Sequence, residues 1–368
     1  MLLRRYFIYL FFIFINFAFS QAHSASDIIL GMSNAQTGPT AQLGIKLKQG
    51  AQGFFSTLNR QGGLYGQQIK IRAYDDGYEP EKTVANTKKL LHEGPLALFG
   101  YVGTPTAYAV MPMIEKSRVP FLMPLTGAEF LRQPVKKQVF NLRASYQQEA
   151  MRQIEYLVEE QGIKRIGLLI QADEFGITLE KAHQLALKKY NLEAKVITRY
   201  RRNTEDIARA LAKLRKHKVD AIVFVGTYKP LAKFINQAAA VNFNPYYTSV
   251  SFVSSADLFA AIDVKAKLLV TEVVPEPSKC NAPICQRFEE DMRQVGVIAP
   301  DRVHLEGYLN AYTFAEVASL CEKELDRDCL LQAFEHFHQD LGEFKINYTQ
   351  LNHQGLNRVY LNFYPNAI

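Results

Sequence analysis

Short apolar runs alternate with amphipathic stretches along the chain from residue 27 onward. The runs are rich in β-branched and aromatic residues, which favour strands, and the stretches between them have the periodicity of helices. Nearly continuous apolar strands separated by helices are typical of a parallel sheet that is covered on both faces. In the first part of the chain we expect strands at 27–33, 68–76, 95–100 and 119–124, and helices at 44–60, 80–92 and 105–117.

The same alternation starts again after residue 145. Two βα arrays in succession predict an α/β protein with two doubly wound parallel-sheet lobes and a ligand cleft between them. The second array predicts strands at 165–171, 193–200, 221–227, 245–251 and 268–277, helices at 147–161, 176–190, 204–217 and 229–241, further helices at 284–295, 304–323 and 326–338, and a last strand at 359–365.

The two arrays divide the chain into two lobes. We expect lobe 1 to comprise residues 26–144 plus 276–343, and lobe 2 to comprise residues 145–275 plus 344–368. In such folds the carboxyl ends of the strands and the amino ends of the helices point into the cleft, which is therefore the expected ligand site.

The start of the chain has a different pattern. Arg4 and Arg5 precede an apolar run at 6–19, and small residues follow it. This run of about 14 residues is shorter than the roughly 20 that a membrane span needs. The pattern predicts a signal peptide at 1–25, cleaved within 20–26, with an uncleaved anchor as the alternative. We therefore expect a protein exported to the periplasm of a bacterium, with no lipid anchor, since no cysteine lies near the cleavage site.

The charge balance is basic, with a sequence pI near 9.0. Cleavage removes Arg4 and Arg5 and lowers the formal net charge from +7 to +5. The remaining basic residues are interspersed with acidic ones in helical stretches such as 201–218, which is typical of a solvated helix face. We expect no nucleic-acid partner.

Four cysteines are an even number, which suits disulfides in an oxidising compartment. Three pairings are open, and the two local pairs close the smallest loops, so we favour Cys280 with Cys285 and Cys321 with Cys329. A zinc site is the alternative, but neither pair has the tight two-residue spacing and no histidine accompanies them.

We find no catalytic motif. The sequence has no Gly-x-Ser-x-Gly elbow, no phosphate-binding Walker loop, no His-Glu-x-x-His and no Ser-x-x-Lys. The segment at the end of the first strand, 31–44, also lacks the glycine spacing that dinucleotide cofactors need. Asp75 and Asp76 could bind a metal at the end of a strand, but carboxylates there more often cap or turn the chain. We therefore predict no enzyme activity and no cofactor.

Polar turns follow the apolar strands instead. Hydroxyl side chains and the free backbone N–H groups of a first helical turn suit an anionic group, and aromatic residues in these turns offer walls for a ligand. An ordinary helix cap explains any one such turn, whereas six in a two-lobed array favour a ligand cleft. The turns lie at 33–44, 100–106, 123–130, 171–176, 225–230 and 249–255.

Several of these segments together resemble one known family, the type I periplasmic substrate-binding proteins of ABC transporters, in particular the leucine/isoleucine/valine-binding group. The longest is "TGPTAQLGIKLKQGAQGFFSTLNRQGGLYGQQIKIRAYDDGYEPEKT" (37–83), and Gly103 with Thr104, "VPFLMPLTGA", "FNLRAS", "DEFG" and "LEGYLNAY" follow in order. The chain is also similar to a less characterised branch, through "TGAEFLR", "RASY", "RNTEDI" and "VSFVSSADL".

The resemblance implies a set of ligand-binding residues. Thr104 matches the hydroxyl residue that holds the ligand's carboxylate, and the segment after the fourth strand contributes backbone and hydroxyl groups. The other matching positions line the side-chain pocket or close over the ligand from lobe 2. The implied set is Leu43, Val102, Thr104, Leu125, Thr126, Gly127, Tyr146, Phe175, Tyr228 and Ser251.

One departure from the family bears on the ligand. Amino-acid binders hold the ammonium group with an acidic residue of lobe 2, but Tyr146 and Ser251 stand at the matching positions here. A buried ammonium group needs an anionic partner, and Glu272, Glu306 or Asp173 could replace the missing one. An amino acid, another carboxylate and an aromatic acid therefore all stay open as ligands.

The resemblance implies a monomeric periplasmic solute-binding protein that closes its lobes on a small molecule and presents it to a membrane ABC permease. One alternative is a ligand-sensing module that docks on a membrane sensor. A third hypothesis is an exported α/β hydrolase, which needs a nucleophile and a base that we do not find.

Overall fold

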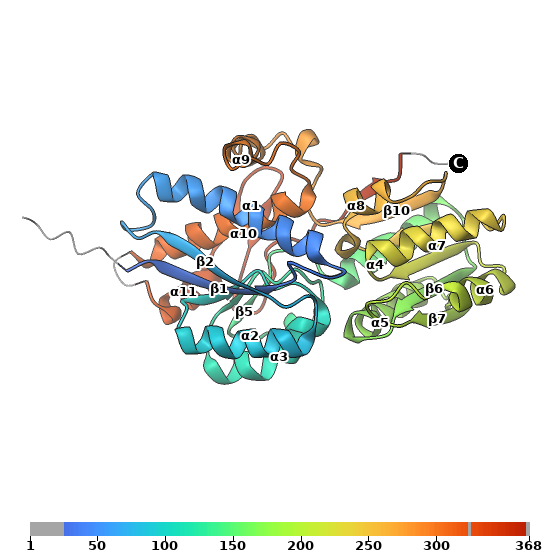
Figure 1. Ribbon diagram of the computed structural model, residues 1–368, viewed down its shortest axis with the longest axis horizontal. Coiled ribbons are helices and arrows are strands. Elements are labelled where there is room, and N and C mark those ends of the chain that lie inside the picture. Colours follow the sequence, from blue (N-terminus) through green and yellow to red (C-terminus); the bar gives the residue numbers. More distant parts are fainter. Residues whose placement is uncertain (1–25, 323–324, 366–368) are drawn as a thin grey trace, which may run out of the picture.

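The computed structural model describes residues 26–322 and 325–365, and it has two lobes side by side along the long axis of the molecule (Figure 1). Each lobe contains a sheet of mostly parallel strands with helices on both faces, which confirms the predicted α/β fold. The predicted signal peptide, residues 1–25, lies outside the described residues.

The sheet of lobe 1 has five parallel strands in the order β2-β1-β3-β4-β5. Alternate residues face opposite layers, so Leu98 and Phe121 pack against α2 and α3, whereas Phe99 and Leu122 pack toward α1 and α10. The strands are β1 (Ile28–Asn34), β2 (Ile69–Asp75), β3 (Ala97–Phe99), β4 (Phe121–Leu122) and β5 (Val139–Phe140); the helices are α1 (Ala41–Arg60), α2 (Pro80–Glu93), α3 (Thr104–Ser117), α9 (Pro283–Gln294), α10 (Arg302–Ala318) and α11 (Arg327–His336).

Helices α1 and α10 pack closely because small residues stand at their crossing. A Cβ atom at Gly50 would lie 1.9 Å from the His304 carbonyl oxygen, and one at Gly307 would lie 2.1 Å from the Leu47 carbonyl oxygen. Only glycine fits at either position. This contact joins the C-terminal helices to lobe 1.

The sheet of lobe 2 has six strands in the order β13-β10-β9-β8-β6-β7, and only β13 is antiparallel to its neighbour. Leu168 and Ile170 face α4 and α5, whereas Leu169 and Phe224 face α6, α7 and α8. The strands are β6 (Ile166–Gln171), β7 (Val196–Tyr200), β8 (Ala221–Val225), β9 (Tyr246–Ser249), β10 (Lys267–Glu272) and β13 (Tyr360–Phe363); the helices are α4 (Tyr146–Glu155), α5 (Glu174–Lys189), α6 (Ala208–Lys216), α7 (Tyr228–Ala240) and α8 (Ser255–Ala260).

The chain crosses between the two sheets three times. It leaves lobe 1 after β5, returns after β10, and enters lobe 2 again before β13. The first and third crossings lie together, because the Asn141 N–H donates to the His353 carbonyl at 2.8 Å and the Leu356 N–H donates to the Leu142 carbonyl at 2.7 Å.

Residues 344–356 pack differently from our expectation, which assigned 344–368 to lobe 2. Phe344, Ile346 and Tyr348 belong to the same hydrophobic cluster as the core of lobe 1. Of residues 344–365, only β13 joins the sheet of lobe 2. The segment includes the second strand of a small hairpin, β11 (His338–Asp340) and β12 (Lys345–Asn347), which the pattern does not predict.

Two disulfides lie in lobe 1. They join Cys280 to Cys285 and Cys321 to Cys329, which are the two local pairings that we favoured over a zinc site.

Candidate functional site

Two turns of lobe 1 lie next to each other at the carboxyl end of its sheet. The Leu125 N–H donates to the Tyr101 carbonyl at 2.7 Å, and the Gly103 N–H donates to the Leu125 carbonyl at 3.2 Å. This pairing sets the first residue of α3, Thr104, against Thr126, and their hydroxyl oxygens are 2.7 Å apart. Both side chains are buried. The structure thus brings together two of the hydroxyl residues implied by the resemblance.

A third hydroxyl in the same region has a local role. The Thr106 hydroxyl donates to the carbonyl oxygens of Val102 at 2.5 Å and Gly103 at 3.0 Å. It therefore satisfies backbone groups at the start of α3 and does not join the pair formed by Thr104 and Thr126.

Tyr146 reaches these hydroxyls from lobe 2. It is the first residue of α4, after a capping box formed by Ser145 and Gln148. The Tyr146 N–H donates to the Gly127 carbonyl at 2.8 Å, and a Cβ at Gly127 would lie 2.5 Å from the tyrosine ring, so glycine is required there. The buried Tyr146 hydroxyl lies next to the Thr104 and Thr126 hydroxyls, although it is not aligned for a regular hydrogen bond to either. Burial raises its pKa, and the Arg143 guanidinium opposes this increase.

Four buried aromatic rings form a chain across the cleft. Tyr78, from the turn after β2 in lobe 1, packs on Phe252 of lobe 2 with ring centroids 5.8 Å apart. Phe252 lies 4.8 Å from Phe175, which in turn lies 5.5 Å from Tyr146. We did not predict Tyr78 or Phe252, although both lie in segments that we quoted, "DDGYEP" and "VSFVSS".

The apolar residues of the implied set lie in the same hydrophobic cluster. Leu43, Val102 and Leu125 of lobe 1 are grouped with Tyr146 and Phe175 of lobe 2. The two lobes therefore share one hydrophobic contact at the cleft.

Tyr228 is not part of this group. It begins α7 and packs against the cluster on the other face of the lobe 2 sheet. Its place in the implied set stays a prediction that the geometry does not favour.

Ser251 belongs to a buried charged network between the two lobes. Its hydroxyl accepts from Arg143 Nη2 at 2.6 Å and donates to Glu149 Oε1 at 3.0 Å. Arg143 Nε also lies 3.0 Å from Glu306 Oε1. The Thr271 hydroxyl donates to Glu149 Oε2 at 2.8 Å. We did not predict Arg143 or Glu149 as site residues. The sequence feature that could have indicated them is the position of "RASYQQE" (143–149), directly after the last strand of lobe 1.

This geometry can be compared with known proteins. A family model described as periplasmic binding protein matches residues 27–362. The chain belongs to the periplasmic binding protein family. Members of this family bind small ligands and work with ABC transporter permeases in the periplasm, which agrees with the class predicted from the sequence.

Relatives of this periplasmic binding protein cover most of its length. A solved structure from Rhodopirellula baltica, described as a possible leucine/isoleucine/valine-binding protein, is 32% identical, covers 92% of this chain and 94% of its own, and has a TM-score of 0.87. A substrate-binding periplasmic protein from Ralstonia solanacearum is 28% identical, covers 92% and 97%, and has a TM-score of 0.83. The Leu/Ile/Val-binding protein of Escherichia coli is 24% identical over 256 residues, or 69% of this chain and 70% of the relative.

The three carboxylates that could replace the missing ammonium partner are engaged within this periplasmic binding protein. Asp173 caps α5 by accepting from the Gly176 N–H at 3.1 Å, and it also accepts from Gln171 at 2.7 Å. Glu306 pairs with Arg143, as described above. Glu272 accepts from the Ser255 hydroxyl, and burial raises its pKa to about 7.

Asp75 and Asp76 form turn contacts in this structure. Asp75 accepts from the backbone N–H groups of Gln36 at 2.8 Å and Gly77 at 2.9 Å, and Asp76 accepts from the Ser33 hydroxyl at 2.8 Å. Within residues 26–322 and 325–365 no cluster of three or more His, Cys, Asp or Glu side chains could hold a metal ion.

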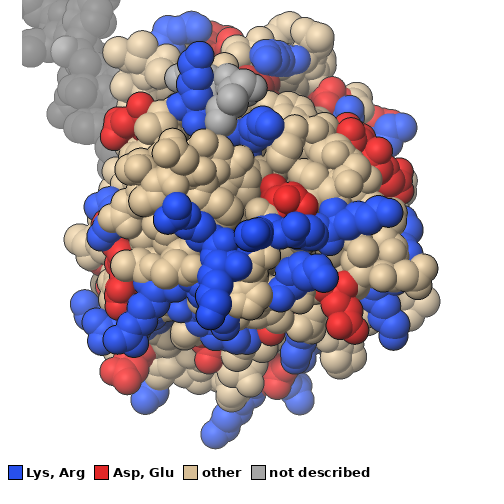
Figure 2. Space-filling view, turned by 90° about the vertical axis from the view of Figure 1, so that its right-hand side faces the viewer, with Lys and Arg blue, Asp and Glu red and all other residues tan. Residues whose placement is uncertain are grey.

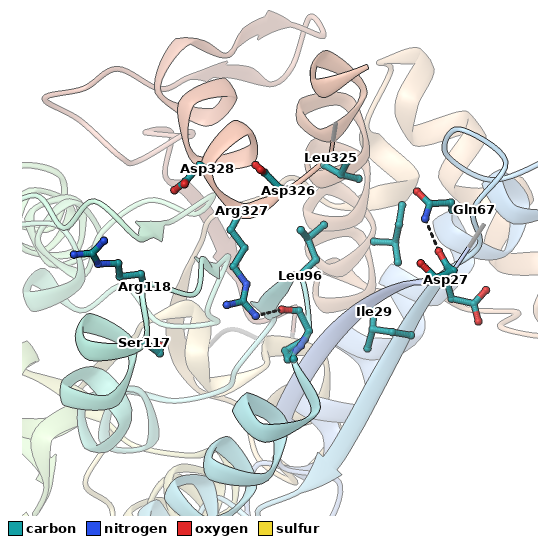
Figure 3. Close-up of a pocket in the computed structure, with 14 residues that line it drawn as sticks. Asp27, Ile29, Gln67, Leu96, Ser117, Arg118, Leu325, Asp326, Arg327 and Asp328 are labelled. Carbon is teal, nitrogen blue, oxygen red and sulfur yellow. Dashed lines mark hydrogen bonds between the residues drawn. The ribbon is translucent and has the colours of Figure 1, made fainter. Parts of the chain in front are cut away.

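A cavity of about 620 Å³ lies at the end of lobe 1 where strand β1 begins (Figure 3). It is lined by the starts of β1 and α11, where Arg327 donates to the Pro95 carbonyl at 2.6 Å. Its wall includes Ser26 and Leu325, which adjoin residues outside the described part. None of the implied ligand residues lines it, so we do not place the ligand there.

Basic side chains gather on the outer face of lobe 2, where Figure 2 shows Lys and Arg in a band. The last turns of two helices contribute to the basic character of this lobe, with Lys188 and Lys189 on α5 and Lys213, Arg215 and Lys216 on α6. Cations at helix C-termini complement the helix dipole.

The parts of the chain that the structure describes contain no helix with the length and hydropathy of a membrane span.

Proposed function

We propose that this protein captures a small organic carboxylate between its lobes and delivers it to an ABC permease. The observation that carries the proposal is the buried pair of hydroxyls on Thr104 and Thr126, with the buried Tyr146 hydroxyl next to them from the other lobe. Hydroxyl donors converging from two lobes suit the two oxygens of a carboxylate.

The aromatic rings suit the apolar body of such a ligand. Tyr78 comes from lobe 1, and Phe175 and Phe252 come from lobe 2, so a ligand among them touches both lobes. A ligand that contacts both lobes binds the closed form more tightly than the open form and shifts the population toward closure. The relatives from Escherichia coli and Rhodopirellula baltica, described as binding Leu, Ile and Val or as possibly doing so, support a ligand of this size that carries a carboxylate.

A thermal-shift screen tests the binding proposal. The panel consists of amino acids, dicarboxylates and aromatic acids, and any compound that binds only the folded state must raise the melting temperature. We expect at least one carboxylate to raise it. If neither a carboxylate nor any other small molecule does so, the protein is not a solute-binding protein of this kind.

Uptake separates transport from sensing. Deleting the gene in the native bacterium should reduce uptake of the identified ligand, and restoring the gene should recover it. If the ligand binds but its uptake is unchanged, the protein instead serves a membrane sensor.

A further inference from the structure

The buried network of Arg143, Glu149, Ser251 and Glu306 joins both lobes and is not explained by the proposed function. Arg143 lies in the first crossing, Glu306 on α10 of lobe 1, and Glu149 on α4 of lobe 2. All three side chains are almost completely buried. Taking charges out of water is costly unless each is paired, so the partner of each group shows what the site can still bind.

The two carboxylates are fully engaged. Glu149 accepts three hydrogen bonds, from the Ser251 N–H at 2.8 Å, the Ser251 hydroxyl at 3.0 Å and the Thr271 hydroxyl at 2.8 Å. Glu306 faces Arg143 with both oxygens, at 3.0 Å from Nε and 3.4 Å from Nη2. An ammonium group arriving here would compete with donors already in place and would approach a guanidinium of the same charge.

The donors are not fully engaged. Arg143 Nη1 is buried without a hydrogen-bond partner in the described structure, and the buried Tyr146 hydroxyl has only the Thr104 and Thr126 hydroxyls beside it. Arg143 and Tyr146 also interact electrostatically, because the Arg143 guanidinium opposes the increase that burial causes in the pKa of the Tyr146 hydroxyl. Buried donors without acceptors cost free energy, and an anion that reaches them recovers it.

We infer that the ligand is a small organic acid without an ammonium group, and that Arg143 Nη1 and the Tyr146 hydroxyl bind its carboxylate together with Thr104 and Thr126. This inference rests on the proposed function and narrows it from carboxylates in general to deaminated ones. The four hydroxyl and guanidinium donors receive the anionic end, and the rings of Tyr78, Phe175 and Phe252 receive the apolar body.

Matched pairs of ligands test the inference. Each pair has the same carbon skeleton with and without the amino group: leucine and 4-methylpentanoate, phenylalanine and 3-phenylpropanoate, glutamate and pentanedioate. We expect the deaminated member of at least one pair to raise the melting temperature and to bind at least tenfold more tightly than its amino acid by calorimetry. Its neutral amide, which lacks the negative charge, should also bind at least tenfold more weakly than the acid.

The outcomes separate the inference from the proposed function. If an amino acid binds as tightly as its deaminated partner or more tightly, the inference is wrong and the proposed function stands. If an amide binds as well as its acid, the guanidinium does not meet the charge and the inference is also wrong. If no member of the pairs and no compound of the wider screen binds, both fail.

A hydroxyl deletion tests the residue assignment. Tyr146→Phe keeps the ring that packs on Phe175 and removes only the donor, so we expect the acid's Kd to rise about tenfold or more, as for hydrogen bonds to charged groups. Tyr348→Phe is the matched control, because its hydroxyl is also buried but lies in the core of lobe 1, against Phe140. An equal change in Kd for both variants, or none for Tyr146→Phe, would overturn the assignment.

Discussion

Two threonines of one turn have different roles. Thr104 presents its hydroxyl to Thr126 in the cleft, whereas Thr106, two residues later, donates to the backbone behind it. Their side chains are chemically identical and both are buried. A comparison of the two therefore separates loss of a ligand contact from loss of a local cap.

Replacing Thr104 by alanine should weaken ligand binding by about 1–3 kcal/mol, because the ligand's carboxylate loses a buried donor. Thr106→Ala should leave the Kd unchanged and lower the melting temperature by removing a cap at α3. Calorimetry with the ligand found in the screen measures the first effect, and thermal unfolding without ligand measures the second. Equal Kd values for the Thr104→Ala and parent proteins would contradict the anchor role.

Glu272 makes stability depend on pH. Burial raises its pKa from 4.5 to about 7, although Arg302 acts in the opposite direction. The folded protein therefore binds this proton more tightly than the unfolded chain, and the free energy of unfolding falls as pH rises from about 4.5 to 7. Above about pH 7 the free energy of unfolding is therefore about 3 kcal/mol lower than below about pH 4.5.

Glu272→Gln should remove this dependence, since an amide does not titrate and its oxygen can still accept from Ser255. We expect the variant to be more stable than the parent at pH 8 and to approach it at pH 4, as measured by urea unfolding at both values. Glu289→Gln on the exposed side of α9 is the control for loss of a surface carboxylate. A Glu272→Gln variant less stable than the parent at pH 8 would disprove the account.

The candidate site could be predicted from the sequence only in part, because some of its residues depend on contacts between the lobes. The pattern predicts polar turns after the strands of a parallel sheet, which meet at one edge, but Thr104 and Thr126 were singled out within those turns by the family resemblance. Arg143, Tyr78 and Phe252 depend on how the two lobes meet, and no periodicity along the chain encodes that contact. Tyr228 follows a strand in the same way as Thr104 does, but it packs on the other face of its sheet.

At the scale of elements, the strands and helices of both arrays are largely as the alternating pattern predicts. Strands such as β6 and β8 are buried along their whole length, which makes their apolar runs unambiguous. The hairpin of β11 and β12 has only three residues in each strand, several of them polar and exposed, so it leaves no such signal. Without the hairpin, nothing in the pattern connects Phe344 and Ile346 to lobe 1. The prediction that these two residues belong to lobe 2 was therefore wrong.

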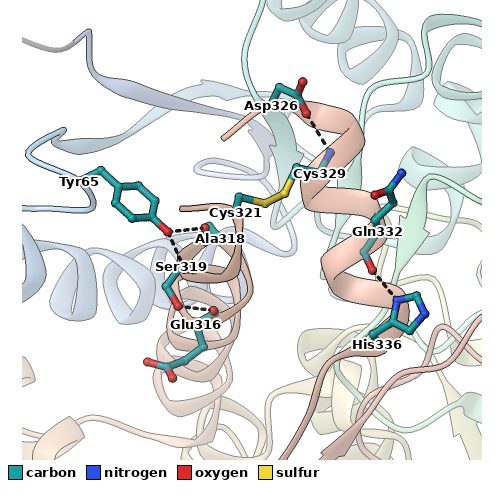
Figure 4. The surroundings of a disulfide bond; sticks show 9 residues. All are labelled: Tyr65, Glu316, Ala318, Ser319, Cys321, Asp326, Cys329, Gln332 and His336. Carbon is teal, nitrogen blue, oxygen red and sulfur yellow. Dashed lines mark hydrogen bonds between the residues drawn. A yellow bond between two sulfur atoms is a disulfide. The ribbon is translucent and has the colours of Figure 1, made fainter. Parts of the chain in front are cut away.

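The disulfide between Cys321 and Cys329 holds α11 to the end of α10 (Figure 4). On α11, Phe334 stacks on Phe140 of β5 with centroids 4.7 Å apart, so this helix covers part of the lobe 1 core. Replacing both cysteines by alanine should lower the free energy of unfolding by roughly 2–3 kcal/mol, as expected for a short loop. Denaturant unfolding of the variant and the parent measures this difference. Free thiols in the oxidised protein isolated from the periplasm would contradict the pairing.

At the scale of the whole molecule, a clasp joins the lobes on the side away from the crossings. Arg202, after the edge strand β7, donates to the Tyr78 carbonyl at 2.5 Å and to Glu79 Oε2 at 2.6 Å; both acceptors follow the edge strand β2. The neighbouring Asn203 donates to Glu79 Oε1 at 2.5 Å. The first two crossings start from β5 and β10, at the other side of each strand order, so opening of the lobes about the crossings would separate the two halves of the clasp.

The clasp should therefore bias the equilibrium between open and closed forms. If closure is needed for tight binding, the apparent Kd rises as the closed fraction falls. Arg202 and Glu79 are partly exposed, so their pair is worth about 1 kcal/mol or less, and Arg202→Ala should weaken ligand binding about two- to fivefold. Arg201→Ala is the matched control, because the Arg201 side chain has no ion pair in the described structure.

A double-mutant cycle decides whether the two partners act together. Arg202→Ala and Glu79→Ala should each raise the Kd, and the double variant should add little to either, since each single change already breaks the clasp. Small-angle scattering of the ligand-free proteins should show a larger radius of gyration for both single variants than for Arg201→Ala. Salt should weaken binding by the parent more than by Arg202→Ala, because screening acts on an exposed pair that only the parent retains. Strictly additive effects with unchanged scattering would mean that the residues stabilise their own lobes and that closure depends on the ligand and the crossings alone.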